Sequence, residues 1–249
     1  MRVLVTFAVE AEFAPWRKLR EFRKTKPFLN SFRSKTDDAE ITVLLTGMGC
    51  KKPWVEATKV IWDGGIDICV STGLAGALRP NHRIGEILVA ADVLTSKSGR
   101  VVSGDSALIE AAVAAGATRV ATFYTADHVI VQADEKQRLS VLADAVEMES
   151  GEIFAEAAAF GARVVAVRAI SDVSTEDLPL DFNKVATGEG GVSIRKILGK
   201  AVASPGSIPS LIRFGQQSKQ AAATLADFLE RFVPSLLVSP AVVSQGAMK

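Results

Sequence analysis

The stretch from Ala145 to Asp172, AVEMESGEIFAEAAAFGARVVAVRAISD, decides the expected fold. It predicts a helix of small residues that turns at Gly161, followed by a strand over Val164–Val167. The apolar run then ends abruptly in polar side chains, which is typical of a buried strand whose carboxyl end faces a site. Ligands of open α/β sheets bind at that end of the strands. Glu149 and Asp172 flank the helix, so we expect their carboxylates to converge there.

Further apolar runs precede this stretch and alternate with helical patterns. Strands are expected over Arg2–Phe7, Ile41–Leu45 and Ile66–Ser71. The alternation predicts an α/β fold, a three-layer α/β/α domain with a mostly parallel, twisted central sheet.

The chain has the length of a single domain, which we place at residues 1–232. Past Asp172, helices are expected over 194–203 and 208–232, separated by Ser204-Pro205-Gly206. Residues 233–249 are expected to form a frayed C-terminal tail.

Composition gives no reason to expect a nucleic-acid or membrane partner. The net charge is only +1, and no apolar run reaches the ~20 residues of a transmembrane helix. Cys50 and Cys69 have no metal-binding spacing and are expected to be free thiols in a reducing compartment. Glu10 and Glu12 interrupt the first apolar run, so no signal peptide is expected and a cytoplasmic location is the default.

Two motifs resemble ligand sites without meeting their requirements. Gly47-Met48-Gly49 follows a strand, as in a dinucleotide-binding turn, but Lys52 stands where the third glycine belongs. His82 and His128 are far apart in the sequence, so each is expected to be a surface or hydrogen-bonded histidine, and no metal site is predicted.

Glu12 lies where the first strand passes into a helix. On the residues alone, an acidic side chain in a first helical turn is explained by the helix dipole. Arg168 and Asp172 likewise have a structural explanation, an ion pair at the end of a strand.

The segments VEMES at Val146–Ser150 and VRAISD at Val167–Asp172 resemble the purine nucleoside phosphorylase/nucleosidase superfamily. The motif Thr72-Gly73-Leu74-Ala75-Gly76 carries the same likeness, which covers roughly residues 1–182. Methylthioadenosine/S-adenosylhomocysteine nucleosidases are the most similar group. The resemblance implies an enzyme that cleaves the N-glycosidic bond of a 5′-substituted adenosine with water, releases adenine, uses no cofactor and forms a homodimer.

The same resemblance implies the catalytic roles. Asp172 would protonate the purine at N7, Glu149 would stabilise the ribosyl cation, and Glu12 would be the base for water. Arg168 could orient Glu12 or the nucleophile. The residues expected to bind substrate are Met148, Arg168, Gly76, Val129, Phe182, Ser171 and Glu147.

Several positions depart from the nucleosidase pattern. Leu74 replaces a serine, Val129 replaces an aromatic residue that stacks on adenine, and the segment from Ala91 to Tyr124 is short. The ending PGSIPSLIRFGQQS resembles that of hopanoid-associated phosphorylases. These features leave open a 5′-adenosylated lipid as substrate and phosphate as nucleophile. A non-catalytic nucleoside-binding protein is a further alternative, although the three carboxylates are retained.

Overall fold

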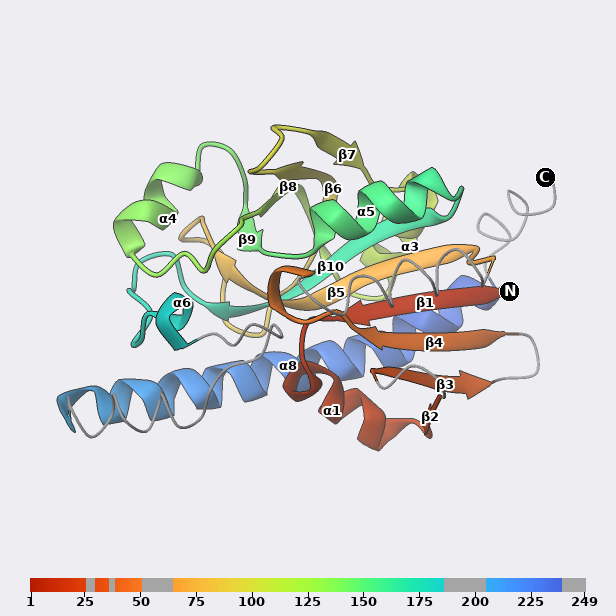
Figure 1. Ribbon diagram of the computed structural model, residues 1–249, viewed down its shortest axis with the longest axis horizontal. Coiled ribbons are helices and arrows are strands. Elements are labelled where there is room, and N and C mark those ends of the chain that lie inside the picture. Colours follow the sequence, from red (N-terminus) through yellow and green to blue (C-terminus); the bar gives the residue numbers. More distant parts are fainter. Residues whose placement is uncertain (26–29, 36–38, 51–64, 186–204, 239–249) are drawn as a thin grey trace.

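The computed structural model describes residues 1–25, 30–35, 39–50, 65–185 and 205–238 (Figure 1). The helix expected over residues 194–203 lies outside this part of the chain. The described strands are β1 Arg2–Phe7, β2 Arg23–Lys24, β3 Ser31–Lys35, β4 Glu40–Leu45, β5 Ile68–Ala77, β6 Ile87–Thr95, β7 Val101–Ser103, β8 Thr118–Thr125, β9 Ala145–Glu147 and β10 Arg163–Asp172. The helices are α1 Glu10–Leu19, α3 Ser106–Ala114, α4 Ala133–Leu139, α5 Ser150–Ala159, α6 Phe182–Val185 and α8 Ile208–Val238, with 3-10 turns η1 Met48–Cys50 and η2 Pro205–Ser207.

One sheet runs through the molecule in the order β10-β6-β8-β9-β5-β1-β4-β3-β2. An additional pairing of β10 with β5 closes five of these strands into a ring. The pairs β1–β4, β1–β5, β5–β10, β6–β8 and β8–β9 are parallel, whereas β10–β6, β5–β9, β6–β7 and the β2–β3–β4 edge are antiparallel. The predicted α/β fold is confirmed, and its sheet is more mixed than the sequence predicts.

Helices cover both faces of the sheet, which gives the three predicted layers. On one face α1, α3 and α8 pack over a core that includes Phe13, Leu108 and Phe228 (Figure 1). On the other face α5 buries Ile153 and Phe154 against the sheet. Burial on both faces explains why β1 and β10 are nearly continuous apolar runs.

Strand β5 differs from the expected strand. The sequence predicts that it ends near Ser71, but it continues through both glycines to Ala77. Pairing with β10 along its length keeps it extended, and Asp172 lies opposite Gly76 in that register. The motif Thr72–Gly76 is therefore part of the sheet.

Helix α8 also runs further than predicted. It reaches Val238, and both Val233 and Leu236 are fully buried in the core. The frayed tail expected from Val233 onward is therefore wrong over residues 233–238, because α8 continues there and Val233 and Leu236 pack in the core. Glu230 of α8 accepts hydrogen bonds from Trp16 Nε1 at 2.6 Å and Arg20 Nε at 2.9 Å, which ties the two helices together.

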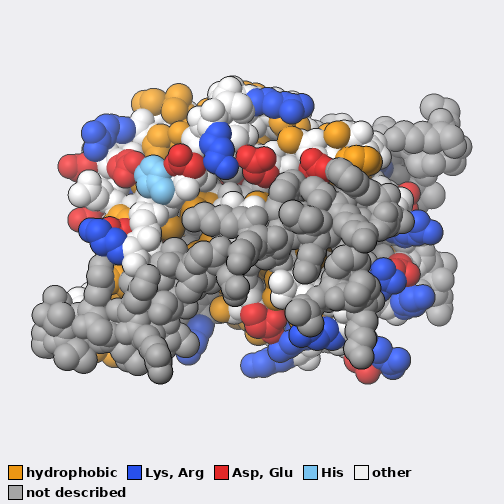
Figure 2. Space-filling model, in the orientation of Figure 1, with side chains coloured by type: hydrophobic (Ala, Val, Ile, Leu, Met, Phe, Trp, Pro, Cys, Tyr) orange, Lys and Arg blue, Asp and Glu red, His pale blue; other side chains and the backbone are white. Residues whose placement is uncertain are grey.

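The described helices include none that is long and apolar enough to cross a membrane. On the face that Figure 2 shows, acidic and basic side chains are interspersed. The free thiols expected at Cys50 and Cys69 are confirmed, and both are buried.

Candidate active site

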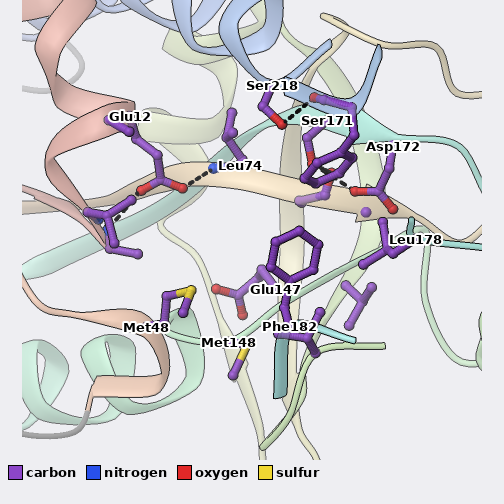
Figure 3. A pocket seen from close by; sticks show the side chains of 18 of the residues that line it. Glu12, Met48, Leu74, Glu147, Met148, Ser171, Asp172, Leu178, Phe182 and Ser218 are labelled. Carbon is purple, nitrogen blue, oxygen red and sulfur yellow. Dashed lines mark hydrogen bonds between the residues drawn. The ribbon is translucent and has the colours of Figure 1, made fainter. Parts of the chain in front are cut away.

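A cavity of about 440 Å³ opens at the carboxyl ends of β1, β5 and β10 and is bounded on one side by α8. Every predicted site residue except Arg168 lines it, namely Glu12, Gly76, Val129, Glu147, Met148, Glu149, Ser171, Asp172 and Phe182. In Figure 3, Glu12 and Asp172 lie at opposite ends of the labelled group, and Met148 and Glu147 lie between them. The structure thus brings together residues from six separate segments of the chain.

Glu12 is buried and is held by main-chain donors. Its Oε2 accepts hydrogen bonds from Ala8 N at 2.9 Å and Val9 N at 3.2 Å, and its Oε1 accepts one from Leu74 N at 3.0 Å (Figure 3). Burial raises the pKa of Glu12, against the opposing effect of these bonds. The helix dipole alone does not account for a carboxylate with this environment, which suits a base working near neutral pH.

The two glycines of β5 each make room for a carboxylate. A Cβ on Gly73 would lie 3.2 Å from both carboxylate oxygens of Glu12, and Gly73 also has a φ of +143°. A Cβ on Gly76 would lie 2.8 Å from Oδ2 of Asp172. Real Cβ atoms essentially never approach as closely as at Gly76, whereas at Gly73 the contact is tight and the positive φ itself favours glycine.

Arg168 lies behind the cavity wall, fully buried. It forms an ion pair with Glu147 at 2.5 Å and donates to Ser150 Oγ at 2.8 Å and Ser71 Oγ at 3.2 Å. Arg168 makes none of the hydrogen bonds that hold Glu12, and a role in orienting the nucleophile stays a prediction. The expected ion pair with Asp172 is wrong, because the partner of Arg168 is Glu147. The reason is the strand geometry, because Arg168 projects toward β9 and the start of α5.

Glu147 and Glu149 have opposite ionisation behaviour. Burial raises the pKa of Glu147, but the charge of Arg168 and hydrogen bonds from Thr125, Glu149 N and Ser150 N outweigh it and leave the pKa below its ordinary value. Burial, together with the charge of Glu147, raises the pKa of Glu149 to about 8. Oε1 of Glu149 accepts a hydrogen bond from Gly49 N at 2.9 Å, so the turn at η1 reaches the site.

Asp172 has two side-chain partners. Its Oδ2 accepts a hydrogen bond from Lys136 Nζ at 2.6 Å, and its Oδ1 accepts one from Ser171 Oγ at 2.8 Å. Ser171 is thereby placed beside the proposed acid, as its position in the sequence suggests.

Other residues at the site are not found by sequence reasoning. Lys136 lies in the polar segment ADEKQRL, which has the composition of an exposed helix. Phe214, Gly215 and Ser218 of α8 line the cavity, and Phe214 packs on Phe182 with ring centroids 5.3 Å apart. Only long-range packing brings α8 to this site, so local patterns carry no signal for it.

A family model described as Phosphorylase superfamily matches residues 2–203. The chain belongs to the phosphorylase superfamily. Among curated relatives it is 27% identical to a DeoD-type purine nucleoside phosphorylase of Actinobacillus pleuropneumoniae, over 59% of this chain and 71% of that protein. It is 28% identical to a DeoD-type purine nucleoside phosphorylase of Geobacillus kaustophilus, over 58% and 71%. The protein is therefore an enzyme of the nucleosidase and nucleoside phosphorylase class, whose members act on N-glycosidic bonds.

Several solved structures share the fold. A futalosine hydrolase mutant of Helicobacter pylori has a TM-score of 0.71 at 18% identity, covering 94% of this chain and 99% of that one. The 5′-methylthioadenosine/S-adenosyl homocysteine nucleosidase of Campylobacter jejuni has a TM-score of 0.70 at 18% identity, covering 94% and 98%. These values confirm the predicted fold, and the family match over residues 2–203 confirms the predicted superfamily. The resemblance of the tail to hopanoid-associated phosphorylases stays a prediction.

Proposed function

We propose that the protein hydrolyses the N-glycosidic bond of a 5′-substituted adenosine and releases adenine. The observation that supports this best is that three buried or half-buried carboxylates, those of Glu12, Glu149 and Asp172, face one cavity. Each has a different environment, which suits a different role in the reaction.

The roles follow from the charges that form as the bond breaks. The departing purine needs a proton, which Asp172 supplies as general acid. The ribosyl group becomes an oxocarbenium-like cation, which the Glu149 carboxylate stabilises near the sugar hydroxyls while Met148 packs against the ring. Glu12 removes a proton from the attacking water. A non-catalytic nucleoside-binding protein would have no use for carboxylates with these environments.

Water is favoured over phosphate by the charge of the cavity wall. Among the described residues that line it, four are carboxylates (Glu12, Glu147, Glu149 and Asp172) and only Lys219 is a lysine or arginine. A phosphate dianion beside Glu12 would be repelled, whereas water would be activated. Phosphorolysis is the second candidate, because the curated relatives named above are phosphorylases.

The 5′ substituent is assigned to the wall between α1 and α8. Val9, Leu74, Phe214 and Ala222 make this part of the cavity largely apolar. Burial of apolar surface gives about 25 cal/mol per Å², so an apolar 5′ group gains affinity here. Adenosine without such a group would be a weaker substrate.

The test is adenine release measured by chromatography, with and without inorganic phosphate. The substrates are methylthioadenosine, S-adenosylhomocysteine, adenosine and an adenosine with a long apolar 5′ chain. We expect phosphate-independent release of adenine and a free sugar, with faster turnover of the 5′-substituted nucleosides. Formation of a sugar 1-phosphate would establish phosphorolysis instead, and failure to cleave any of these nucleosides would overturn the proposal.

We further propose a homodimer, on the resemblance to the nucleosidases alone. Light scattering on the eluting protein distinguishes a dimer from a monomer.

A further inference from the structure

Lys136 is a fully buried lysine on the short polar helix α4. Its neighbours Asp134 and Gln137 are exposed, and only Leu139 at the end of the helix packs against a small apolar cluster. Transfer of an ammonium group out of water costs several kcal/mol unless the charge is paired and hydrogen-bonded. The partners of Lys136 therefore explain its position.

All three partners of the ammonium group belong to the end of β10 and the loop that follows. Nζ donates to Asp172 Oδ2 at 2.6 Å, to Val173 O at 2.9 Å and to Glu176 O at 3.2 Å. An ammonium group has three N–H donors, and each has an acceptor here. The side chain is thus fixed, with one of its hydrogens directed at the carboxyl group that lines the cavity.

We propose that Lys136 is the positioning residue of the general acid Asp172, an inference that rests on the proposed function. During cleavage the proton passes from Asp172 to the purine, the electrons of the C–N bond go to the purine, and a carboxylate is left on Asp172. The Lys136 ammonium keeps its own protons and stabilises that carboxylate, at a distance set before the reaction begins. Ser171 holds the other oxygen, so the carboxyl group has one orientation.

A purely structural role makes a different prediction. Through Val173 and Glu176, Lys136 also supports the loop that leads to Leu178 and Phe182, and the Glu176 carboxylate pairs with Arg213 of α8 at 2.7 Å. If Lys136 only shaped this wall, its loss would slow every substrate that uses the cavity. If it serves Asp172, its loss matters only when the leaving group needs a proton.

The experiment compares Lys136→Met with the wild type on two substrates with the same 5-methylthioribosyl group. One is methylthioadenosine, and the other is the p-nitrophenyl riboside, whose nitrophenolate leaves without protonation. We expect kcat for methylthioadenosine to fall about 10²- to 10³-fold, as for loss of acid catalysis, while nitrophenol release stays within a few-fold of the wild type. The matched control is Lys35→Met, on strand β3, which removes an exposed lysine and should leave both rates unchanged.

A second measurement uses Lys136→Ala with added amines. Ethylammonium should restore part of the methylthioadenosine activity, whereas tetramethylammonium, which has no N–H donor, should not. Where Lys136→Met does not fold, as judged by thermal unfolding, Lys136→Gln takes its place, because it removes the charge and keeps donors for the two carbonyls.

Three results would overturn the inference. Equal losses on both substrates without amine rescue would show a structural role, and unchanged methylthioadenosine turnover would show no role. If the wild-type protein cleaves neither substrate, the proposed function itself is overturned. That outcome is distinct from the two above, which overturn only the role of Lys136.

Discussion

The main-chain N–H of Glu149 donates a hydrogen bond to Oε2 of Glu147 at 2.9 Å. Both carboxylates are buried, and the charge of Glu147 acts on the ionisation of Glu149. Arg168 neutralises Glu147, so Glu147 stays anionic and its charge disfavours ionisation of Glu149. The pair therefore combines a permanently charged residue with one that titrates near neutral pH.

The first prediction concerns the pH dependence of activity. Burial and the charge of Glu147 raise the pKa of Glu149 to about 8, so below that pH most molecules carry it protonated. Because a carboxylate stabilises the ribosyl cation, kcat/KM should rise about tenfold per pH unit up to that region. A stopped assay from pH 6 to pH 9 measures this. Glu149→Gln should be slow and should lack the rise; a wild-type profile that falls over this range would contradict the assignment.

The same residue should make stability depend on pH. In the unfolded chain Glu149 ionises at its ordinary value near 4.5, while in the folded protein it stays protonated up to about 8. The folded state thus binds more protons within this window, and its contribution to stability is lost as pH rises from 4.5 through 8. Thermal unfolding at pH 5 and pH 8 should show a smaller drop in Tm for Glu149→Gln than for the wild type. An equal drop would assign the effect to other groups.

Arg168→Met should destabilise the protein strongly. It leaves Glu147 as an unpaired buried charge, which typically costs about 3–5 kcal/mol. Each kcal/mol corresponds to about 2–4 °C in Tm for a domain of this size. The control is the double variant Arg168→Met/Glu147→Gln, which removes the unpaired charge and should recover part of the lost stability. A double variant no more stable than the single one would argue against the ion pair as the cause.

Asp172→Asn should reduce adenine release by about 10²- to 10⁴-fold, because an amide cannot donate the required proton. Asp134→Asn changes an exposed aspartate of α4 and should have no effect. Circular dichroism checks that both variants are folded. Near-normal turnover by Asp172→Asn would show that another group is the acid.

Gly76→Ala should inactivate the enzyme without altering any residue that carries the chemistry. Its Cβ would lie 2.8 Å from Oδ2 of Asp172 and displace that carboxyl group. Gly206→Ala, where a Cβ meets nothing within 4 Å, is the matched control.

Gly73→Ala would add both a close contact with Glu12 and backbone strain at a positive φ. Gly116→Ala would add the backbone strain without such a contact. Gly116 has a φ of +107° and open space around its Cβ position. Both variants should lose stability, but only Gly73→Ala should also lose activity per folded molecule. Full activity in folded Gly73→Ala would show that the site tolerates movement of Glu12.

The sequence predicts the strands that are buried on both faces, because an apolar run such as Val164–Val167 has few other structural explanations. The catalytic roles proposed for the three carboxylates come from resemblance, since a lone Glu12 after a strand is compatible with an ordinary helix start. Strand β5 is predicted too short because glycines usually interrupt strands, and its pairing with β10, and with β9 at Gly76, keeps both glycines extended.

Long-range contacts account for the remaining differences. Lys136 is buried because the loop after β10 surrounds its ammonium group, which no local pattern in α4 indicates. The extension of α8 past Phe232 depends on its packing against α1 and the sheet. Arg168 pairs with Glu147 because β9 runs beside β5 and β8, a neighbourhood that sequence spacing does not reveal.

The close approach of Gly73 to Glu12 and of Gly76 to Asp172 gives a way to recognise relatives that have lost the reaction. A descendant can keep every acidic side chain of the site and still be inactive through one added methyl group at either glycine. Such a chain would look complete to a search for catalytic residues alone. Glycine at both positions of the β5 motif is therefore as informative about activity as the carboxylates themselves, and it can be read from sequence without a structure.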